Sequence, residues 1–168
     1  MNLEKVVFGF FILLALTLNF GFFYGEIDNP EHHAAVADFW QTDTLATENG
    51  LTAVDLFNAV ESGQVKAVWI MATNPVDSLP EADRVRHALM ACDTVVVSDC
   101  VASGDPLACA DIRLPALGWG EKSGMVTNSE RCVSRQRPFV KAPGDAKADW
   151  WIVTEVARRM GYDYAFPY

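Results

Sequence analysis

The side chains best suited to binding a ligand are short polar ones that follow two apolar runs in the middle of the chain. Their hydroxyl, amide and carboxylate groups, together with nearby backbone N–H groups, can meet an anionic or ribose-bearing ligand. The same residue types also favour turns and helix caps for structural reasons, so a nucleotide site and a set of plain turns are both open interpretations. Thr73, Asn74 and Pro75 follow the first run, and Ser98 and Asp99 end the second.

A third polar feature is the loop Trp119–Gly124, which contains Lys122. Beyond it the chain is locally basic, although the whole protein has a formal net charge of -9. Positive groups of this kind can meet phosphates or a neighbouring domain, and a solvated charged loop would look the same in the sequence. The basic residues are Arg131, Arg135, Arg137 and Lys141.

Other arrangements that carry chemistry are missing from the sequence. There is no G-x-G-x-x-G or Walker A motif, and His87 lies inside an expected helix without an evident partner. The four cysteines form no C-x-x-C pair and match no zinc or iron–sulfur spacing, so they are expected to be small buried thiols. We therefore predict no catalytic residue and no metal ligand in this chain.

Hydrophobic periodicity indicates the elements that must position these residues. Helices with one apolar face alternate with short apolar strands, an order that predicts a parallel sheet covered by helices. In such sheets ligands bind beyond the carboxyl ends of the strands, where the polar side chains would lie. The expected helices are 52–61, 81–91 and 149–160, with Thr52 and Asp149 as caps, and the expected strands are 65–72, 94–97 and 112–114.

Residues 100–148 show little regular pattern apart from the last of these strands. A compact domain rarely carries so long an irregular stretch unless it binds a ligand or packs on a neighbour. The chain of 168 residues is long enough for one domain, and its negative charge argues against a nucleic-acid-binding protein.

The chain begins differently, with 20 uncharged residues from 6 to 25. As a helix this run would be about 30 Å long, the thickness of a bilayer core, so a membrane helix is favoured over a signal peptide. A hydrophobic element buried in a larger assembly is the alternative. The adjacent His32 and His33 are expected to form a solvated linker pair.

Residues 1–33, MNLEKVVFGFFILLALTLNFGFFYGEIDNPEHH, resemble the start of a family of small, uncharacterised integral membrane proteins. The pattern changes after His33, which indicates a fusion or a rearranged gene. We therefore expect two parts: a hydrophobic, transmembrane segment with a seam over residues 1–33, and an α/β domain over residues 34–168.

The second part carries a different resemblance. The strings WIMATNPVDSLP, VVVSDC, DIRLPALGWGEKSGMVTNSER, VSRQRPF and DWWIVTEVARRMGY occur in this order. Together they resemble assimilatory-type nitrate reductases of the molybdopterin oxidoreductase superfamily, also called the DMSO reductase superfamily. The resemblance covers residues 34–168 as an internal fragment.

This resemblance implies a cytoplasmic enzyme of nitrate assimilation that reduces nitrate to nitrite at molybdenum held by two molybdopterin guanine dinucleotides. An iron–sulfur cluster would deliver the electrons. The matching stretch would be part of an α/β domain that holds one dinucleotide tail. Carried over by motif, Asn74, Ser98, Asp99 and Lys122 would contact the cofactor, and Thr73 and Pro75 would shape the first turn.

The chain also departs from the family pattern. Cys132 stands where the family usually has a second arginine, and the cluster-binding cysteines have no match. The regions that supply the molybdenum ligand and the second dinucleotide site have no match either. We expect this stretch to need the rest of a nitrate reductase chain as its partner and to be inactive alone. The alternative is a membrane-tethered, non-enzymatic α/β module that binds a nucleotide or a protein partner.

Overall fold

The computed structural model describes residues 29–40, 45–46 and 50–162. The chain divides into two compact units, Met1–Ala59 and Val60–Tyr168. The predicted hydrophobic helix at residues 6–25 lies outside the described residues. Within the described ranges, no helix combines the length and the apolar character needed to cross a bilayer.

The first unit contains helix α2, Pro30–Trp40, which includes His32 and His33. Asn29 caps this helix, because its side-chain oxygen accepts the Glu31 N–H at 3.0 Å. The predicted solvated linker pair is therefore wrong: both histidines are half-buried within the first turns of a helix. The sequence does contain a signal for this helix, because Asn29 is a favoured capping residue and Pro30 is favoured at the first helical position.

Helix α3, Ala53–Glu61, starts in the first unit and ends in the second. Its predicted cap is confirmed. The Thr52 hydroxyl donates to the Asp55 carboxylate at 2.6 Å and accepts the Asp55 N–H at 3.4 Å. Gly63 lies just past the end with φ +72°, a conformation that glycine adopts without strain.

The second unit is built on three parallel strands, β1 (Ala67–Met71), β2 (Thr94–Asp99) and β3 (Ile112–Pro115). Their order is β1-β2-β3, with β2 in the centre. The register places Met71 beside Ser98 and Asp99 beside Pro115. The predicted α/β class with a small parallel sheet is confirmed, and β2 extends further than expected because it includes Ser98 and Asp99.

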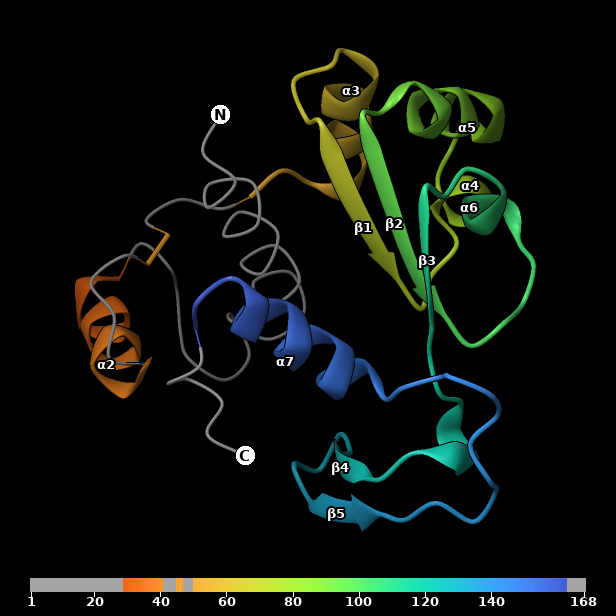
Figure 1. Ribbon diagram of the computed structural model, residues 1–168. Coiled ribbons are helices and arrows are strands. Elements are labelled where there is room, and N and C mark those ends of the chain that lie inside the picture. The colour runs from red at the N-terminus through yellow and green to blue at the C-terminus, as the bar shows by residue number, and fades with distance from the viewer. Residues whose placement is uncertain (1–28, 41–44, 47–49, 163–168) are drawn as a thin grey trace. The chain divides into compact units, whose positions relative to one another are not determined.

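Helices α4 (Pro75–Ser78), α5 (Ala82–Ala91) and α6 (Asp105–Ala108) connect these strands. They gather along one side of the sheet (Figure 1). The β1-to-β2 and β2-to-β3 connections both lie on this side, as right-handed βαβ connections that continue in one direction across a sheet require. The core of the unit is apolar and almost fully buried; its members include Val68, Ile70, Val76, Val85, Leu89, Val95, Val97 and Leu107.

A polar contact lies on the opposite side of the sheet. Trp69 Nε1 donates to the Ser98 hydroxyl at 2.7 Å, and Ser98 is fully buried. Both residues belong to the set of strand positions that alternates with the buried Val68, Ile70 and Val97. This bond gives the buried Ser98 hydroxyl a hydrogen-bond partner, and burial of a hydroxyl without one would lower the stability of the fold.

The stretch predicted to be irregular contains regular elements besides β3 and α6. The 3₁₀ helix η2 (Trp119–Glu121) precedes an antiparallel hairpin of β4 (Gly124–Thr127) and β5 (Val133–Gln136). These strands have only four residues each and are largely exposed, so they lack the apolar pattern that identifies a strand.

The last described helix is α7, Asp149–Arg159. The predicted cap is wrong: Ala148 is the capping position and Asp149 already lies in the first turn. Ala116 and Lys147 form a parallel bridge, so the chain passes along the end of β3 immediately before α7 begins. This bridge aligns the start of α7 with the carboxyl ends of the strands.

The Trp69–Ser98 bond leads to a prediction for stability. Substitution Trp69→Phe removes the donor but keeps an aromatic ring, leaving the buried Ser98 hydroxyl without this partner. We expect the free energy of unfolding to fall by about 1–2 kcal/mol in urea denaturation. Trp119→Phe is the control, because the Trp119 side chain is largely exposed and its expected effect is within about 0.5 kcal/mol. Equal effects of both substitutions would contradict the proposed role of the bond.

Candidate functional site

The parallel sheet brings four chain segments to one edge, which we call the carboxyl edge (residues 72–75, 99–101, 116–122 and 147–149). Backbone hydrogen bonds hold these segments side by side. The Ala72 N–H donates to the Ser98 backbone carbonyl at 3.0 Å, and the Ala116 N–H donates to the Asp99 backbone carbonyl at 2.9 Å. The Leu117 N–H donates to the Lys147 backbone carbonyl, also at 2.9 Å. The loops that were expected to bind a ligand therefore follow neighbouring strands.

Asn74 lies at this edge as the cap of α4. Its side-chain oxygen accepts the Asp77 N–H at 3.3 Å, and its amide nitrogen donates to Asp105 Oδ2 at 3.4 Å. An asparagine side chain has two N–H donors and an oxygen with two lone pairs, so these contacts leave capacity for a ligand.

The two neighbours of Asn74 differ in access. Thr73 is exposed beyond the end of β1, so its hydroxyl can meet a ligand. Pro75 is buried in the first turn of α4, where its ring fixes the backbone. Ala72 has φ +51°, so the backbone turns sharply as it leaves the strand.

The two predicted site residues on β2 also differ in their access to solvent. Ser98 does not lie at the rim: it is fully buried, with its hydroxyl bound to Trp69. Asp99 is half-buried, and its Oδ1 accepts the Val101 N–H at 3.2 Å in a tight turn. A carboxylate has about four acceptor positions, so Asp99 retains acceptor capacity at the edge.

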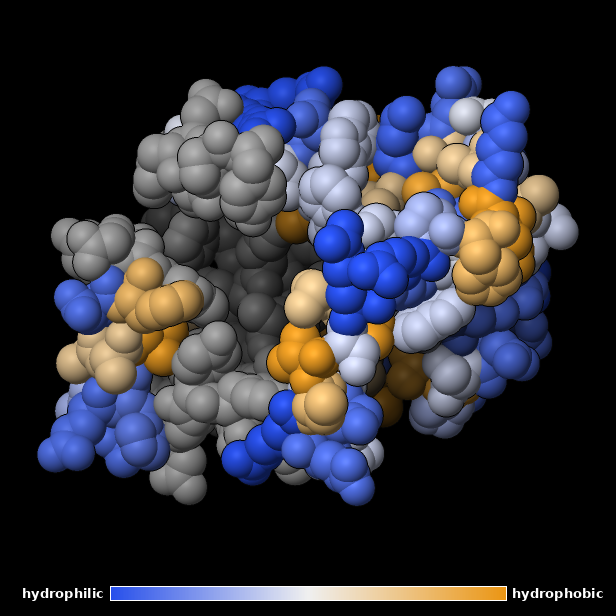
Figure 2. Space-filling model, turned by 90° about the horizontal axis from the view of Figure 1, so that it is seen from below, coloured by the Kyte–Doolittle hydropathy of each residue, from blue (hydrophilic) through white to orange (hydrophobic). Residues whose placement is uncertain are grey.

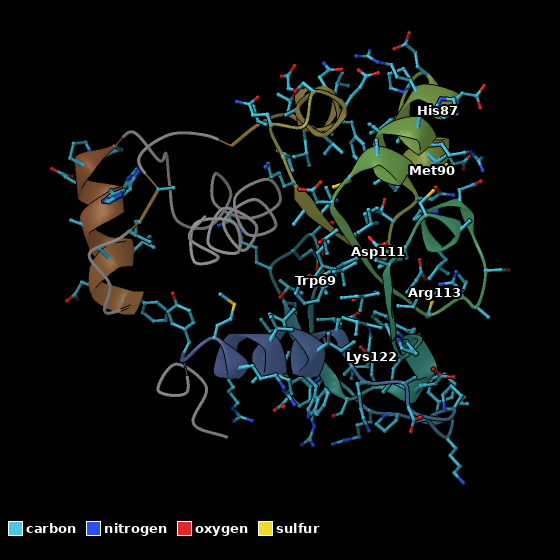
Figure 3. All side chains as sticks on the ribbon, turned by 45° about the horizontal axis from the view of Figure 1, so that its top comes forward. Trp69, His87, Met90, Asp111, Arg113 and Lys122 are labelled. Carbon is cyan, nitrogen blue, oxygen red and sulfur yellow. The ribbon has the colours of Figure 1, made fainter. Side chains whose placement is uncertain are left out.

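Lys122 is held at the same edge by α7. Its ammonium group forms an ion pair with Asp149 in the first turn of that helix, and Trp150 Nε1 donates to the Ser123 carbonyl at 3.1 Å. Figure 3 shows Lys122 near the beginning of α7 and Trp69 on the sheet. The Lys122 side chain is 26% exposed, so its charge is partly accessible.

The basic stretch begins at Arg131, in the turn between β4 and β5, and continues past the hairpin. Arg135 lies on β5, and Arg137 and Lys141 follow it; all three are exposed. Large apolar residues lie in the same region, including Met125 and Phe139, which are 65% and 80% exposed. Figure 2 shows hydrophobic residues beside hydrophilic ones on one face of the surface. Among the described residues, Arg135, Arg137 and Lys141 form no hydrogen bond or ion pair with Asn74 or Asp99.

The cysteines match only part of the sequence prediction. All four are free, and Cys92 and Cys109 are half-buried. Cys100 and Cys132 are exposed, because they lie in turns after β2 and before β5, so the prediction of buried thiols is wrong for these two. Among the described residues, no three His, Cys, Asp or Glu side chains are grouped to hold a metal ion.

The geometry above can be compared with known proteins. Residues 3–159 match the family model described as "Molybdopterin oxidoreductase". The chain belongs to the molybdopterin oxidoreductase family. This match runs through residues 3–33 as well, and the resemblance of that segment to small membrane proteins is not supported.

Individual relatives agree with the family. The chain is 50% identical over 162 residues, 96% of its length and 18% of the relative's, to a nitrate reductase of Klebsiella oxytoca. It is 39% identical over 132 residues, 78% of its length and 19% of the relative's, to an F420-dependent formate dehydrogenase subunit alpha of Methanocaldococcus jannaschii.

A solved structure, acetylene hydratase from Pelobacter acetylenicus, matches with a TM-score of 0.61 and 26% identity, covering 70% of this chain and 17% of that one. Thus the chain spans about a fifth of the length of the relatives it matches. The shared α/β architecture agrees with the parallel sheet described above.

Three side-chain contacts that shape this edge had no signal in the sequence. Asp105, Asp149 and Trp69 are the partners of Asn74, Lys122 and Ser98, at separations of 31, 27 and 29 residues. Local periodicity carries no information about contacts at such separations. Only the fold brings each pair together.

The cysteines lead to a chemical prediction. Burial raises the pKa of the Cys92 and Cys109 thiols, which lowers the fraction of reactive thiolate. We expect iodoacetamide to alkylate the exposed Cys100 and Cys132 about tenfold faster or more at pH 7.5, with a rate measured for each site by peptide mass spectrometry. In urea the four rates should converge; a difference that persists in urea would show that local sequence, not the fold, sets it.

Proposed function

We propose that this chain is part of a molybdenum-dependent nitrate reductase that converts nitrate to nitrite, and that it supplies one side of a molybdopterin guanine dinucleotide site. The observation that carries the proposal is the polar carboxyl edge of the sheet in a chain 50% identical to a nitrate reductase. The proposed enzyme is cytoplasmic, takes part in nitrate assimilation and holds a bis-molybdopterin guanine dinucleotide with an iron–sulfur cluster elsewhere in the assembled protein.

The residues present fit the tail of such a dinucleotide in chemical type. Asp99 offers carboxylate oxygens that can accept from guanine N–H groups or ribose hydroxyls, and Asn74 offers an amide N–H. Lys122 supplies a partly exposed positive charge for phosphate oxygens, and Thr73 supplies a hydroxyl. Ser98 and Pro75 are proposed to act through the shape of the two turns, since both are buried.

The role of these residues is to bind and orient. The cofactor, when bound, supplies a molybdenum centre for the redox chemistry, and the protein fixes its position. Asp99 would hold one end of the tail from the central strand, and Lys122 would offset phosphate charge near α7. No catalytic residue and no metal ligand is proposed among the residues of this edge.

Nitrate is favoured over formate as the substrate of the assembled enzyme. The similarity to the nitrate reductase extends over 96% of the chain at 50% identity, against 78% at 39% for the formate dehydrogenase subunit. The alternative of a membrane-tethered, non-enzymatic module draws no support from these comparisons.

Binding of guanosine diphosphate tests the proposed edge, because this nucleotide reproduces the guanosine and diphosphate of the cofactor tail. We expect the 168-residue chain to bind it in calorimetry, and Asp99→Asn to weaken binding by about 10-fold through loss of a charge-assisted acceptor. Asp93→Asn is a matched control, since Asp93 precedes the amino end of the same strand. No binding by the unsubstituted chain, or equal weakening by both variants, would contradict the proposal.

The proposed inactivity of the isolated chain has a separate test. Purified chain should hold no stoichiometric molybdenum and should not reduce nitrate with a chemical reductant, because one side of a dinucleotide site does not hold the cofactor in place. Metal analysis and a nitrite assay measure both quantities. Stoichiometric molybdenum together with nitrite production would overturn the inactivity, and oxidation of formate instead would overturn the choice of substrate.

A further inference from the structure

Asn74 is linked to two residues that neither the motifs nor the proposed function includes. Its amide nitrogen donates to Asp105 Oδ2 at 3.4 Å, and Arg86 Nη2 donates to the other carboxylate oxygen, Oδ1, at 2.6 Å. Asn74 precedes α4, Arg86 lies on α5 and Asp105 is the first residue of α6. The three side chains therefore connect the three helices that cover one side of the sheet.

These contacts select one orientation of the Asn74 amide. Its oxygen accepts the Asp77 N–H, while its nitrogen faces the Asp105 carboxylate. A flipped amide would place its oxygen against that carboxylate and its nitrogen against a backbone N–H. Both of those contacts are repulsive, because carboxylates only accept and backbone N–H groups only donate.

Arg86 in turn holds Asp105. The guanidinium group is always charged, and its short bond to Oδ1 leaves Oδ2 directed at Asn74. The Asn74–Asp105 distance is long for a hydrogen bond, so the negative charge of Asp105 matters to its strength. A neutral, freely rotating side chain at position 105 would fix the amide less well.

We propose that Asp105, held by Arg86, is a positioning residue that orients Asn74 so that its second N–H donates to an oxygen of the bound dinucleotide tail. The proposal rests on the proposed function, in which Asn74 contacts the cofactor. It adds two residues that support the carboxyl edge from α5 and α6, and it gives Asn74 the role of a donor. The accepting oxygen belongs either to the diphosphate or to the nucleoside.

The chain contains a closely matched ion pair for comparison. Arg84, on the same helix as Arg86, pairs with Glu61 at 2.5 Å, and their side chains are 46% and 43% exposed. The Arg86 and Asp105 side chains are 41% and 39% exposed. Removal of Glu61 thus takes one carboxylate from an α5 arginine without touching Asn74.

The experiment compares guanosine diphosphate affinity by calorimetry in the full chain. Asp105→Ala should weaken binding about 3- to 10-fold, the value of one oriented hydrogen bond. Asp105→Asn has one acceptor oxygen where Arg86 and Asn74 need two, so it should not restore the lost affinity, and Glu61→Ala should leave affinity unchanged. In an Asn74→Ala background, Asp105→Ala should have no further effect. Inorganic pyrophosphate, tested in parallel, should share the weakening only if the acceptor is a phosphate oxygen.

A second readout needs no ligand. In nuclear magnetic resonance spectra of the free chain, the side-chain amide of Asn74 should shift and exchange its protons faster in Asp105→Ala, but not in Glu61→Ala. An unchanged Asn74 amide, or equal loss of affinity in Asp105→Ala and Glu61→Ala, would overturn the positioning role. If the unsubstituted chain binds no guanosine diphosphate, the proposed function fails, while the amide signals still decide whether Asp105 orients Asn74.

Discussion

The pairing of β2 with strands on both sides is the constraint on which the second unit depends. Val95, Val97 and Ser98 in this strand are almost fully buried, and its backbone bonds to both β1 and β3. Since side chains alternate across a sheet, a slip by one residue would move Val95 and Val97 away from the side covered by the helices and would separate Ser98 from Trp69. The apolar burial of β2 therefore fixes the register, and the register decides which loops meet at the carboxyl edge.

The polar residues of that edge differ in how much of their bonding capacity the fold uses. Ser98 is buried against Trp69, so its hydroxyl stabilises the sheet and cannot reach solvent. Asn74 and Asp99 each bond to a backbone N–H but have further hydrogen-bonding groups. A side chain with several donors or acceptors can shape its loop and keep further bonding capacity, so motif residues of one kind divide into fully buried positions and positions that retain such capacity.

The sequence was sufficient for the elements that bury an apolar face and insufficient for the contacts between them. Thr52 identified the start of α3, and apolar periodicity identified α5, whose Val85, Ala88 and Leu89 are buried, because these patterns are local. The hairpin was missed because its strands have four residues each and their apolar and polar residue types do not alternate. The partner of Lys122 was missed because Asp149 was interpreted as a helix cap, a role that its position in the first turn excludes.

The relatives limit what this stretch of sequence can determine. Proteins named as a nitrate reductase, a formate dehydrogenase subunit and an acetylene hydratase all match it, although their names describe different substrates. A segment common to such proteins cannot by itself select among nitrate, formate and acetylene. What they can share is the task of binding one cofactor, and that task needs a rigid sheet edge with donors and acceptors in fixed places. Asn74, Asp99 and Lys122 provide such groups, and the buried β2 holds two of the loops that carry them. Substrate selectivity must then arise from residues that these proteins do not have in common.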